Sequence, residues 1–440
     1  MINESFEVTF GVEVEAILAF HESLLQAHLN TTNPTCTIIK DLPEDARRDL
    51  CIAQPEYLLS RPKYMGWGLS TPTNYPTSHM DHRFQQHFDD NIQKHGCRGY
   101  AGEILHLAHN ILPQGVRIHD SFTEKFDNFN SWHITHERSL VGVTKPTLAH
   151  QFATSGRSIP TTELENWDTH GIELVSRVLP FHPSSFSEIN THLQSLTGTE
   201  ETNHMAFTTE HCGLHVHIGL PTPPDQDPET PPPTFSLATL QHLAYLLVIY
   251  EKAISTLHPP HRREGSPASL IDLQTNLDNF IEEPTYDFSS DWEDDAADIP
   301  TIPTDDSAPP ISFAAARSKI FSPHMTIPRL ASLMSGKSKG HIVNWSYVAR
   351  TDGRARTLEF RQHAGELRGE EVQWWVGFCV GMVRLSEERG RAMGGCVEEW
   401  EGRGKGGEGY KWREWGEGIC VENLLGEMGM EGRGEWGRGW

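Results

Sequence analysis

Apolar and polar residues alternate in several short segments of the chain, which predicts strands with one apolar face. These strands are expected over 6–20, 131–143, 171–180, 212–220, 341–348 and 356–363. Apolar residues recur at spacings of three and four over 81–113, 236–257 and 369–388, and a further helix is expected within 16–29. Short strands interleaved with longer helices, with no internal repeat, favour an α+β fold.

Three segments interrupt these elements, and a fourth closes the chain. Residues 30–80 are rich in Pro and Thr, 221–235 contain PTPPDQDPETPPP, and 282–310 are acidic and rich in Pro. We predict disordered insertions there, because Pro has no backbone donor and acidic segments bury little apolar surface. After about residue 388 the chain is rich in Gly, Glu, Arg and Trp without a period. The prediction is one domain over 6–388 and a low-complexity tail over 389–440.

Composition and charge argue against several classes of binding partner and indicate a cellular location. The 440 residues include 36 Lys and Arg against 60 Asp and Glu, for a net charge of -24, which argues against nucleic-acid and anionic-membrane partners. The N-terminus lacks the basic and apolar regions of a secretory signal, and the apolar stretch Leu243–Tyr250 is far short of the roughly 20 residues of a membrane span. The seven Cys are scattered without CxxC pairs. Reduced thiols and a cytoplasmic location are therefore expected.

Four of the predicted strands carry charged or imidazole side chains opposite their apolar residues. These are Glu13 and Glu15 in GVEVE, Glu173 in GIELVS, His215 and His217 in CGLHVHIGL, and Glu359, Arg361 and His363 in RTLEFRQHA. Any one segment alone also fits an exposed strand face. Acids gathered with His and Arg favour a site that binds a cation and an anion, because carboxylates suit Mg²⁺ or Mn²⁺ and Arg matches phosphate.

Five segments, in this order, resemble the amidoligase family common in fungi: GVEVE, WHITHERSL, GIELVSRVL, CGLHVHIG and TLEFRQHAGEL. This family belongs to the carboxylate–amine ligases with a glutamine synthetase-like fold, and the resemblance covers roughly residues 6–388. It implies a curved, mainly antiparallel sheet with helices on its outer face and with ATP and metal ions on its concave face. It also implies an amide-forming reaction in which ATP phosphorylates a carboxylate and an amine attacks the acyl phosphate.

The resemblance also assigns roles to residues at the matching positions. It implies the metal ligands Glu13, Glu15, Glu173, His217 and Glu359. It implies the catalytic groups Arg361, His217 and Glu359, and the nucleotide or phosphate contacts His215, Arg361, Arg262 and Arg263. A plain basic turn after a helix is the other interpretation of HPPHRR, which holds the last two. The expected cofactors are ATP and Mg²⁺ or Mn²⁺, and the expected substrates are a small-molecule or peptide carboxylate and an amine.

Two positions depart from the family pattern. Glu137 stands where the family has an Asp before the Ser, and Arg177 stands where it has a Pro. Two alternatives to a ligase stay open. One is a non-catalytic relative that binds nucleotide or peptide, and the other is a metal-dependent hydrolase, since an HxH pair with acids also binds Zn²⁺. A ligase consumes ATP only with its carboxylate, and a hydrolase needs no ATP.

Overall fold

The computed structural model describes residues 6–32, 37–39, 57–59, 99–119, 129–137, 139–140, 143–223, 225, 230–263, 313–335, 341–350, 356–393 and 421–430. The chain divides into two compact units. Unit 1 comprises Met1–Phe6, Thr222–Gln362 and Cys379–Trp440, and unit 2 comprises Glu7–Pro221 and His363–Phe378.

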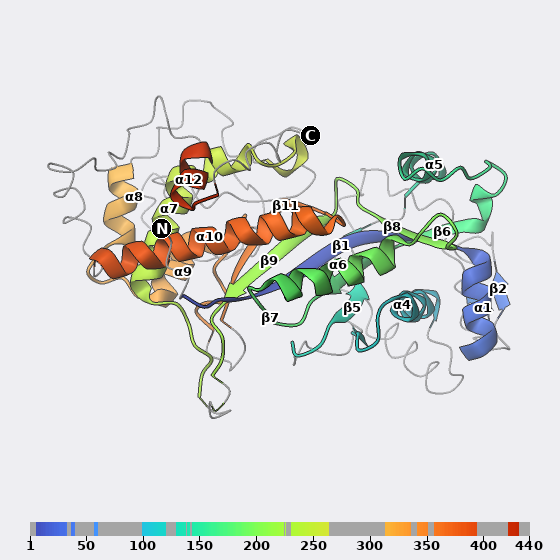
Figure 1. The fold of residues 1–440 in the computed structure, drawn as a ribbon, viewed down its shortest axis with the longest axis horizontal. Coiled ribbons are helices and arrows are strands. Elements are labelled where there is room, and N and C mark those ends of the chain that lie inside the picture. Colours follow the sequence, from blue (N-terminus) through green and yellow to red (C-terminus); the bar gives the residue numbers. More distant parts are fainter. Residues whose placement is uncertain are drawn as a thin grey trace, which may run out of the picture. The chain divides into compact units, whose positions relative to one another are not determined.

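A mostly antiparallel sheet forms the centre of unit 2 (Figure 1). Its strands are β1 (Thr9–His21), β4 (Arg117–Ile118), β5 (His133–His136), β6 (Trp167–Val175), β7 (Leu179–Pro180), β8 (His204–Phe207) and β9 (Gly213–Gly219). The order is β9-β1-β6-β5-β4, and β7 and β8 also pair with β1. Only β4 runs parallel to its neighbour. A separate parallel pair joins β2 (Thr37–Ile39) to β3 (Tyr57–Leu59).

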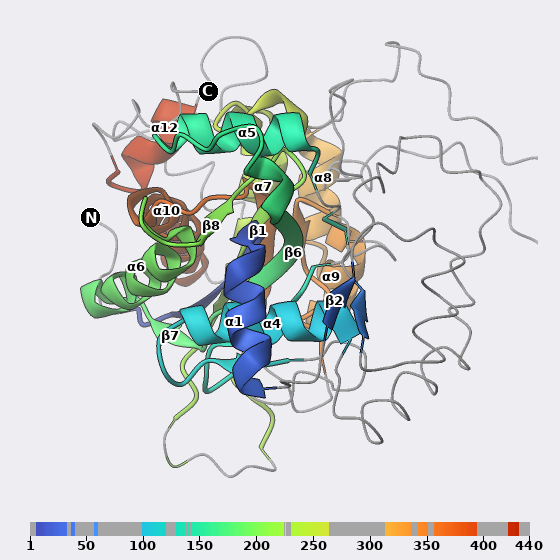
Figure 2. The same cartoon turned by 90° about the vertical axis from the view of Figure 1, so that its right-hand side faces the viewer.

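Helices lie on both faces of this sheet, which differs from the expectation of helices on its outer face alone. They are α1 (Glu22–Thr32), α4 (Gly99–Ile111), α5 (Lys145–Thr154), η1 (Leu164–Asn166), α6 (Pro183–Thr197) and the start of α10 (Gly369–Met393). Phe10 of β1 stacks on Phe186 of α6, so α6 covers the face formed by the even-numbered residues of β1. On the other face, Ile17 and Ala19 pack with Phe152 of α5. In both views α4 and α5 lie on opposite sides of the strands (Figures 1 and 2).

Unit 1 is mainly helical. Its elements are α7 (Leu237–Ser255), η2 (Pro260–Arg262), α8 (Phe313–Ile320), α9 (Ile327–Ser335), β10 (Val343–Asn344), most of β11 (Leu358–Ala364), the rest of α10, and α12 (Val421–Glu427). The hydroxyl of Ser236 accepts from the backbone N–H of Thr239 and caps α7. Helix α7 buries most of its side chains, including Leu240, Leu243 and Leu247. It therefore forms the core of unit 1.

The structure confirms a mixed fold with a mostly antiparallel sheet and helices, and it corrects two boundaries. The helix expected within 16–29 begins only at Glu22, because β1 continues to His21 and pairs with β6 and β8 over its whole apolar end. The tail expected over 389–440 contains helical residues. Helix α10 extends to Met393, and α12 buries Leu424 and Leu425. A pair of Leu gives α12 an apolar face that the average composition of the tail conceals.

The structure describes only parts of the predicted insertions. The predicted insertion over 282–310 and most of 30–80 lie outside them, and 221–235 are described only at their two ends. The pattern missed α5 and α6, which have few apolar residues. Their start signals are present in the sequence: Thr144 and His182 cap these helices, and each cap is followed within two residues by a Pro.

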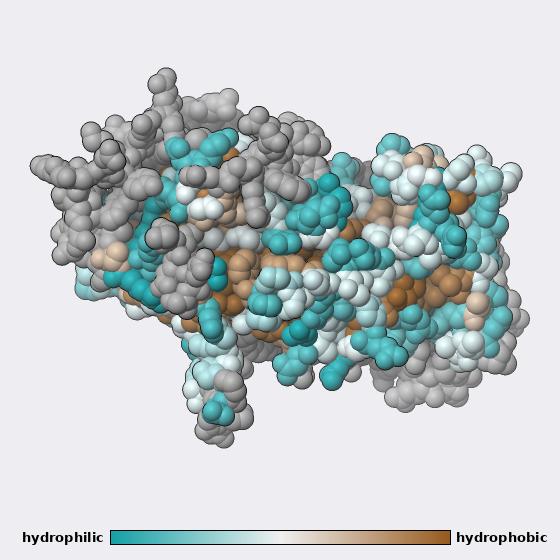
Figure 3. Space-filling view, viewed as in Figure 1, coloured by the Kyte–Doolittle hydropathy of each residue, from teal (hydrophilic) through white to brown (hydrophobic). Residues whose placement is uncertain are grey.

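The surface of the described residues carries few large apolar side chains. Among the described residues, Val178 is the large hydrophobic residue with an exposed side chain. On the face shown in Figure 3, apolar patches lie among hydrophilic side chains. Among the described helices, none combines the length and the hydropathy that a membrane crossing requires.

A buried imidazole in unit 1 makes the stability of the protein depend on pH. His242 is 4% exposed, its Nε2 has no hydrogen-bond partner among the described residues, and its ring packs edge-on to Phe321. Burial, with the nearby charge of Arg389, lowers the pKa of His242 to about 4. Between its usual pKa and this value, the unfolded chain binds a proton that the folded protein does not. This difference removes stability as the pH falls.

We expect His242 to lower the free energy of unfolding by about 2 kcal/mol when the pH falls from 7 to 5. Urea unfolding of wild type and His242→Leu at the two pH values measures it, because the variant should lose less stability by that amount. The control is His324→Leu, whose exposed side chain should leave the wild-type dependence unchanged. An equal pH dependence in wild type and His242→Leu would contradict the prediction.

Candidate metal centre

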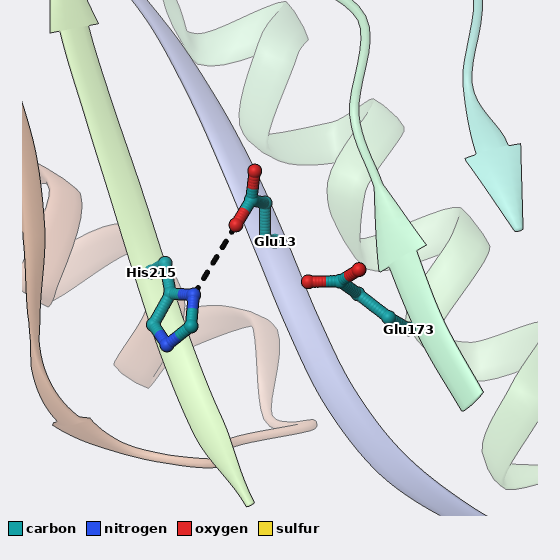
Figure 4. Close-up of side chains that lie close together, drawn as sticks. All are labelled: Glu13, Glu173 and His215. Carbon is teal, nitrogen blue, oxygen red and sulfur yellow. Dashed lines mark hydrogen bonds and ion pairs between the residues drawn. The ribbon is translucent and has the colours of Figure 1, made fainter. Parts of the chain in front are cut away.

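Strand register brings the predicted acids and imidazoles of unit 2 onto one face. Glu13 lies opposite His215, and Glu15 lies opposite Glu173. Residues opposed across antiparallel strands point to the same side, so side chains from β1, β6 and β9 converge. Figure 4 shows Glu13, Glu173 and His215 turned toward one another. This is the face that becomes apolar under α5 at Ile17.

Two imidazoles hold the carboxylate of Glu13. Its Oε2 lies 3.2 Å from Nδ1 of His215, and its Oε1 lies 3.0 Å from Nε2 of His217. Burial raises the pKa of Glu13, but the charges and hydrogen bonds of His217 and His215 outweigh it and hold this pKa well below its usual range. Glu13 is therefore ionised at neutral pH and fixed in orientation. Gly11 of β1 lies opposite His217 of β9.

The carboxylate of Glu15 is held from the backbone. Its Oε2 accepts a hydrogen bond of 2.7 Å from the N–H of Gly213, and its Oε1 lies 3.7 Å from Nε2 of His215. The residue is 9% exposed. A carboxylate whose direction is set by a main-chain donor is preorganised for a ligand, because little side-chain entropy remains to be lost.

Two sets of potential cation ligands adjoin in unit 2. In the first, ligand atoms of Glu13, Glu173 and His215 all lie within 4.8 Å of one another. In the second, carboxylate oxygens of Glu15, Glu137 and Glu173 satisfy the same limit. Glu173 belongs to both sets, so two cations bound here would share it. The first set mixes nitrogen and oxygen, and the second offers only oxygen, the ligand that Mg²⁺ prefers.

Glu137 is the member of these sets that the sequence left in doubt. It follows β5, where its N–H bonds to the carbonyl oxygen of Gly171, and its Oε1 accepts from the N–H of Ser139 at 2.7 Å. A Cβ on Gly171 would lie 2.6 Å from the carbonyl oxygen of Glu137 and 2.7 Å from Cβ of Leu140. The chain after β5 can therefore cross β6 closely only because residue 171 lacks a side chain.

The sequence pattern did not identify Thr135 as a residue of the site. It lies opposite Glu173 in the sheet, is 2% exposed, and its Oγ1 has no hydrogen-bond partner among the described residues. A buried hydroxyl without a partner is costly, and here it stands on the face of the acids. Gly171 and Thr135 each interrupt the apolar and charged pattern of their strand. This interruption is the only signal of them in the sequence.

The second departure from the family pattern has a structural role. The guanidinium of Arg177 donates to both carboxylate oxygens of Glu188, at 2.8 and 2.7 Å. The indole N–H of Trp132 donates to Oε1 of the same carboxylate at 2.7 Å. The side chain of Arg177 thus ties the end of β6 to α6, which covers the face opposite the acids.

The remaining predicted residues belong to unit 1. Glu359 is 1% exposed, accepts from the amide of Asn344 at 2.8 Å and is paired with Arg361. Arg262 is buried and donates to the carbonyl oxygens of Arg361 and Gln362. Arg263 donates to the carbonyl oxygens of His258 and Thr256. The described contacts of Arg262 and Arg263 support backbone structure, and their contact with phosphate stays a prediction.

Comparison with known protein families, with curated proteins and with solved structures finds no match to this chain. The functional conclusion therefore rests on the chemistry of the described residues.

Proposed function

We propose that the protein is an ATP-dependent carboxylate–amine ligase that uses Mg²⁺ and forms an amide bond through an acyl phosphate. The observation that carries this proposal is the pair of adjoining ligand sets that share Glu173. Transfer of a phosphoryl group needs charge neutralisation and positioning more than covalent help from the protein. Two adjacent sites for divalent cations on one face of a sheet meet that need.

The residues of unit 2 fit divalent cations. Glu15, Glu137 and Glu173 would hold a hard cation, and Glu13 with His215 would hold a second one beside it. Bound Mg²⁺ with ATP would supply the phosphoryl group and neutralise its negative charge. The chain itself supplies orientation: His217 and His215 fix Glu13, and the N–H of Gly213 fixes Glu15.

The proposal includes a glutamine synthetase-like fold for the catalytic domain. Support comes from the antiparallel order of the central strands and from α6, which covers the face opposite the acids. The phosphate-facing role of Arg361 and the metal role of Glu359 belong to the same proposal. We also propose a cytoplasmic location, where ATP is available and where buried cysteines such as Cys212 and Cys379 stay reduced.

A metal-dependent hydrolase is the second candidate, because His215 and His217 stand beside two acids. Imidazole nitrogen with carboxylate oxygen also suits Zn²⁺. The all-oxygen set of Glu15, Glu137 and Glu173 favours Mg²⁺ and thereby the ligase.

Calorimetric titration of ATP into the purified protein, with Mg²⁺ or with EDTA, tests the proposal. We expect binding in the micromolar to millimolar range that disappears in EDTA, followed by phosphate release only when a carboxylate and an amine are both supplied. Binding of Zn²⁺ with no affinity for Mg²⁺–ATP, in a protein whose circular dichroism shows it folded, would favour the hydrolase. Mg²⁺–ATP binding without turnover for a panel of acids and amines would favour the non-catalytic relative.

A further inference from the structure

One row of side chains crosses five strands of unit 2. Arg117 of β4 lies opposite His133 of β5, which lies opposite Val175 of β6. Val175 in turn lies opposite Glu13 of β1, which lies opposite His215 of β9. Residues in such a row point to the same side of the sheet. The face that holds the carboxylates therefore ends, at its β4 edge, in a guanidinium.

The side chain of Arg117 is available for a ligand. The residue is exposed, and it makes no ion pair or side-chain hydrogen bond to a residue that the structure describes. The other described cationic residues of unit 2 are engaged with carbonyl or carboxylate oxygens: Lys145, Arg157, Arg177 and Arg368. In a chain with a net charge of -24, an uncommitted guanidinium on the face of the acids marks a place for an anion.

Imidazoles flank Arg117 on the same face. The ring of His133 lies 6.2 Å from that of His119, and the two planes are perpendicular. His119 follows β4 two residues after Arg117, so this contact supports the placement of the Arg117 and His133 side chains on one face of the sheet. Both imidazoles are buried, at 7% and 4% exposure. Guanidinium and imidazole N–H groups together recognise a carboxylate or a phosphate.

We propose that Arg117 and His133 bind the distal anionic group of a ligand whose other end reaches the cation sets. Three strand spacings separate Arg117 from Glu13, which is about 14 Å between their Cα atoms, and the long side chain of Arg117 shortens this gap. Val175 lies between them as an apolar spacer that is 4% exposed. The row thus fits a ligand with an anion at each end and an apolar middle.

This inference rests on the proposed function and extends it to the class of substrate. The ligand is a carboxylic acid with a second carboxylate or a phosphate, or it is the nucleotide itself, with its triphosphate running from the cation sets toward Arg117. Both sources share the chemistry of an oxyanion. If the anion belongs to the acid, Arg117 acts as a specificity-determining residue, because a monocarboxylate gains no ion pair with its guanidinium.

The experiment measures three affinities in wild type, Arg117→Gln and Arg117→Lys. The first is for Mn²⁺ alone, by electron paramagnetic resonance. The second is for a non-hydrolysable ATP analogue with Mn²⁺, and the third is for glutarate added to that mixture. The matched control is Arg329→Gln, which removes the same charge from an exposed site in α9 of unit 1.

We expect Arg117→Gln to bind Mn²⁺ as wild type does. Its affinity for one of the two anions should fall by about tenfold or more. Arg117→Lys should bind that anion with intermediate affinity, because the charge stays and the planar fork is lost. A lower affinity for glutarate would show that Arg117 contacts the acid substrate. A lower affinity for the ATP analogue would show that it contacts the nucleotide.

Three results would overturn the inference. Unchanged affinities for both anions in Arg117→Gln, with Mn²⁺ still bound, would remove Arg117 from the site and leave the proposed function standing. Failure of wild type to bind either anion would also remove Arg117 from the site, and lack of affinity for the ATP analogue would in addition contradict the proposed function. Failure of wild type to bind Mn²⁺ would overturn the proposed function together with this inference.

Discussion

Replacing Glu173 by Gln should abolish the binding of divalent cations to unit 2 while the fold survives. Glu173 belongs to both ligand sets, so its loss removes one oxygen ligand from each. Loss of a direct ligand exceeds the 10- to 100-fold cost typical of outer-shell partners, so we expect Mn²⁺ affinity to fall by about 100-fold or more. Mn²⁺ titration followed by electron paramagnetic resonance measures it, with two sites expected in wild type.

The stability of the variant without cations distinguishes a binding site from a structural network. Glu173→Gln relieves repulsion among three neighbouring carboxylates, so in EDTA we expect it to be at least as stable as wild type. The control for the lost charge is Glu163→Gln, an exposed acid that should bind Mn²⁺ normally. Wild-type Mn²⁺ binding in Glu173→Gln would contradict the assignment of both sets.

Glu13→Gln should behave in the opposite way in EDTA. His217 and His215 hold the pKa of Glu13 below its usual range, so its ionised form stabilises the folded protein at neutral pH. Removal of that charge should cost about 2 kcal/mol of unfolding free energy. Of the two sets in unit 2, only the one with His215 loses a ligand. Comparison of the two Gln variants by urea unfolding and by Mn²⁺ stoichiometry therefore separates the two roles.

Replacing Gly171 by Ala should destabilise the protein and weaken the all-oxygen set. A Gly to Ala change inside a strand is ordinarily favourable, because Gly has more conformational freedom to lose on folding. Here the new Cβ would meet two carbonyl oxygens, at 2.6 Å from Glu137 and 2.9 Å from Leu140. These are backbone atoms, so the segment that carries Glu137 must move away from β6. We expect a loss of about 2–3 kcal/mol in unfolding free energy.

The matched control is Gly11→Ala in β1, on the same face. Its Cβ would lie 3.5 Å from Oγ of Ser176 and 4.0 Å from Cβ of His217, which are ordinary contacts. This variant should stay within about 0.5 kcal/mol of wild type. Mn²⁺ titration of Gly171→Ala should show the loss of one site and the retention of the other. Equal stability of the two Ala variants, with full Mn²⁺ stoichiometry in both, would show that Glu137 does not depend on Gly171.

Strands β1 and β9 of the site were predictable because each carries a strict alternation. GVEVE and GLHVHIG each place valines, or Val with Leu and Ile, on one face and Glu or His on the other. Burial bears this out: Val12, Val14, Leu214 and Val216 are at most 1% exposed. The pattern failed for β4 and β8, which are too short for an alternation to stand out, and for α5 and α6, whose polar turns hide their apolar stripe.

The sequence by itself determined which side chains share a face within one strand, because alternation is a local property of extended backbone. It therefore predicted the pair Glu13 and Glu15 and the pair His215 and His217. Only the tertiary structure decided which strands are neighbours and in what register. That register sets Glu15 against Glu173, brings Glu137 over Gly171 and aligns Arg117 with His133. These pairings join residues far apart in the chain, so they depend on the packing of the whole sheet and not on any one segment.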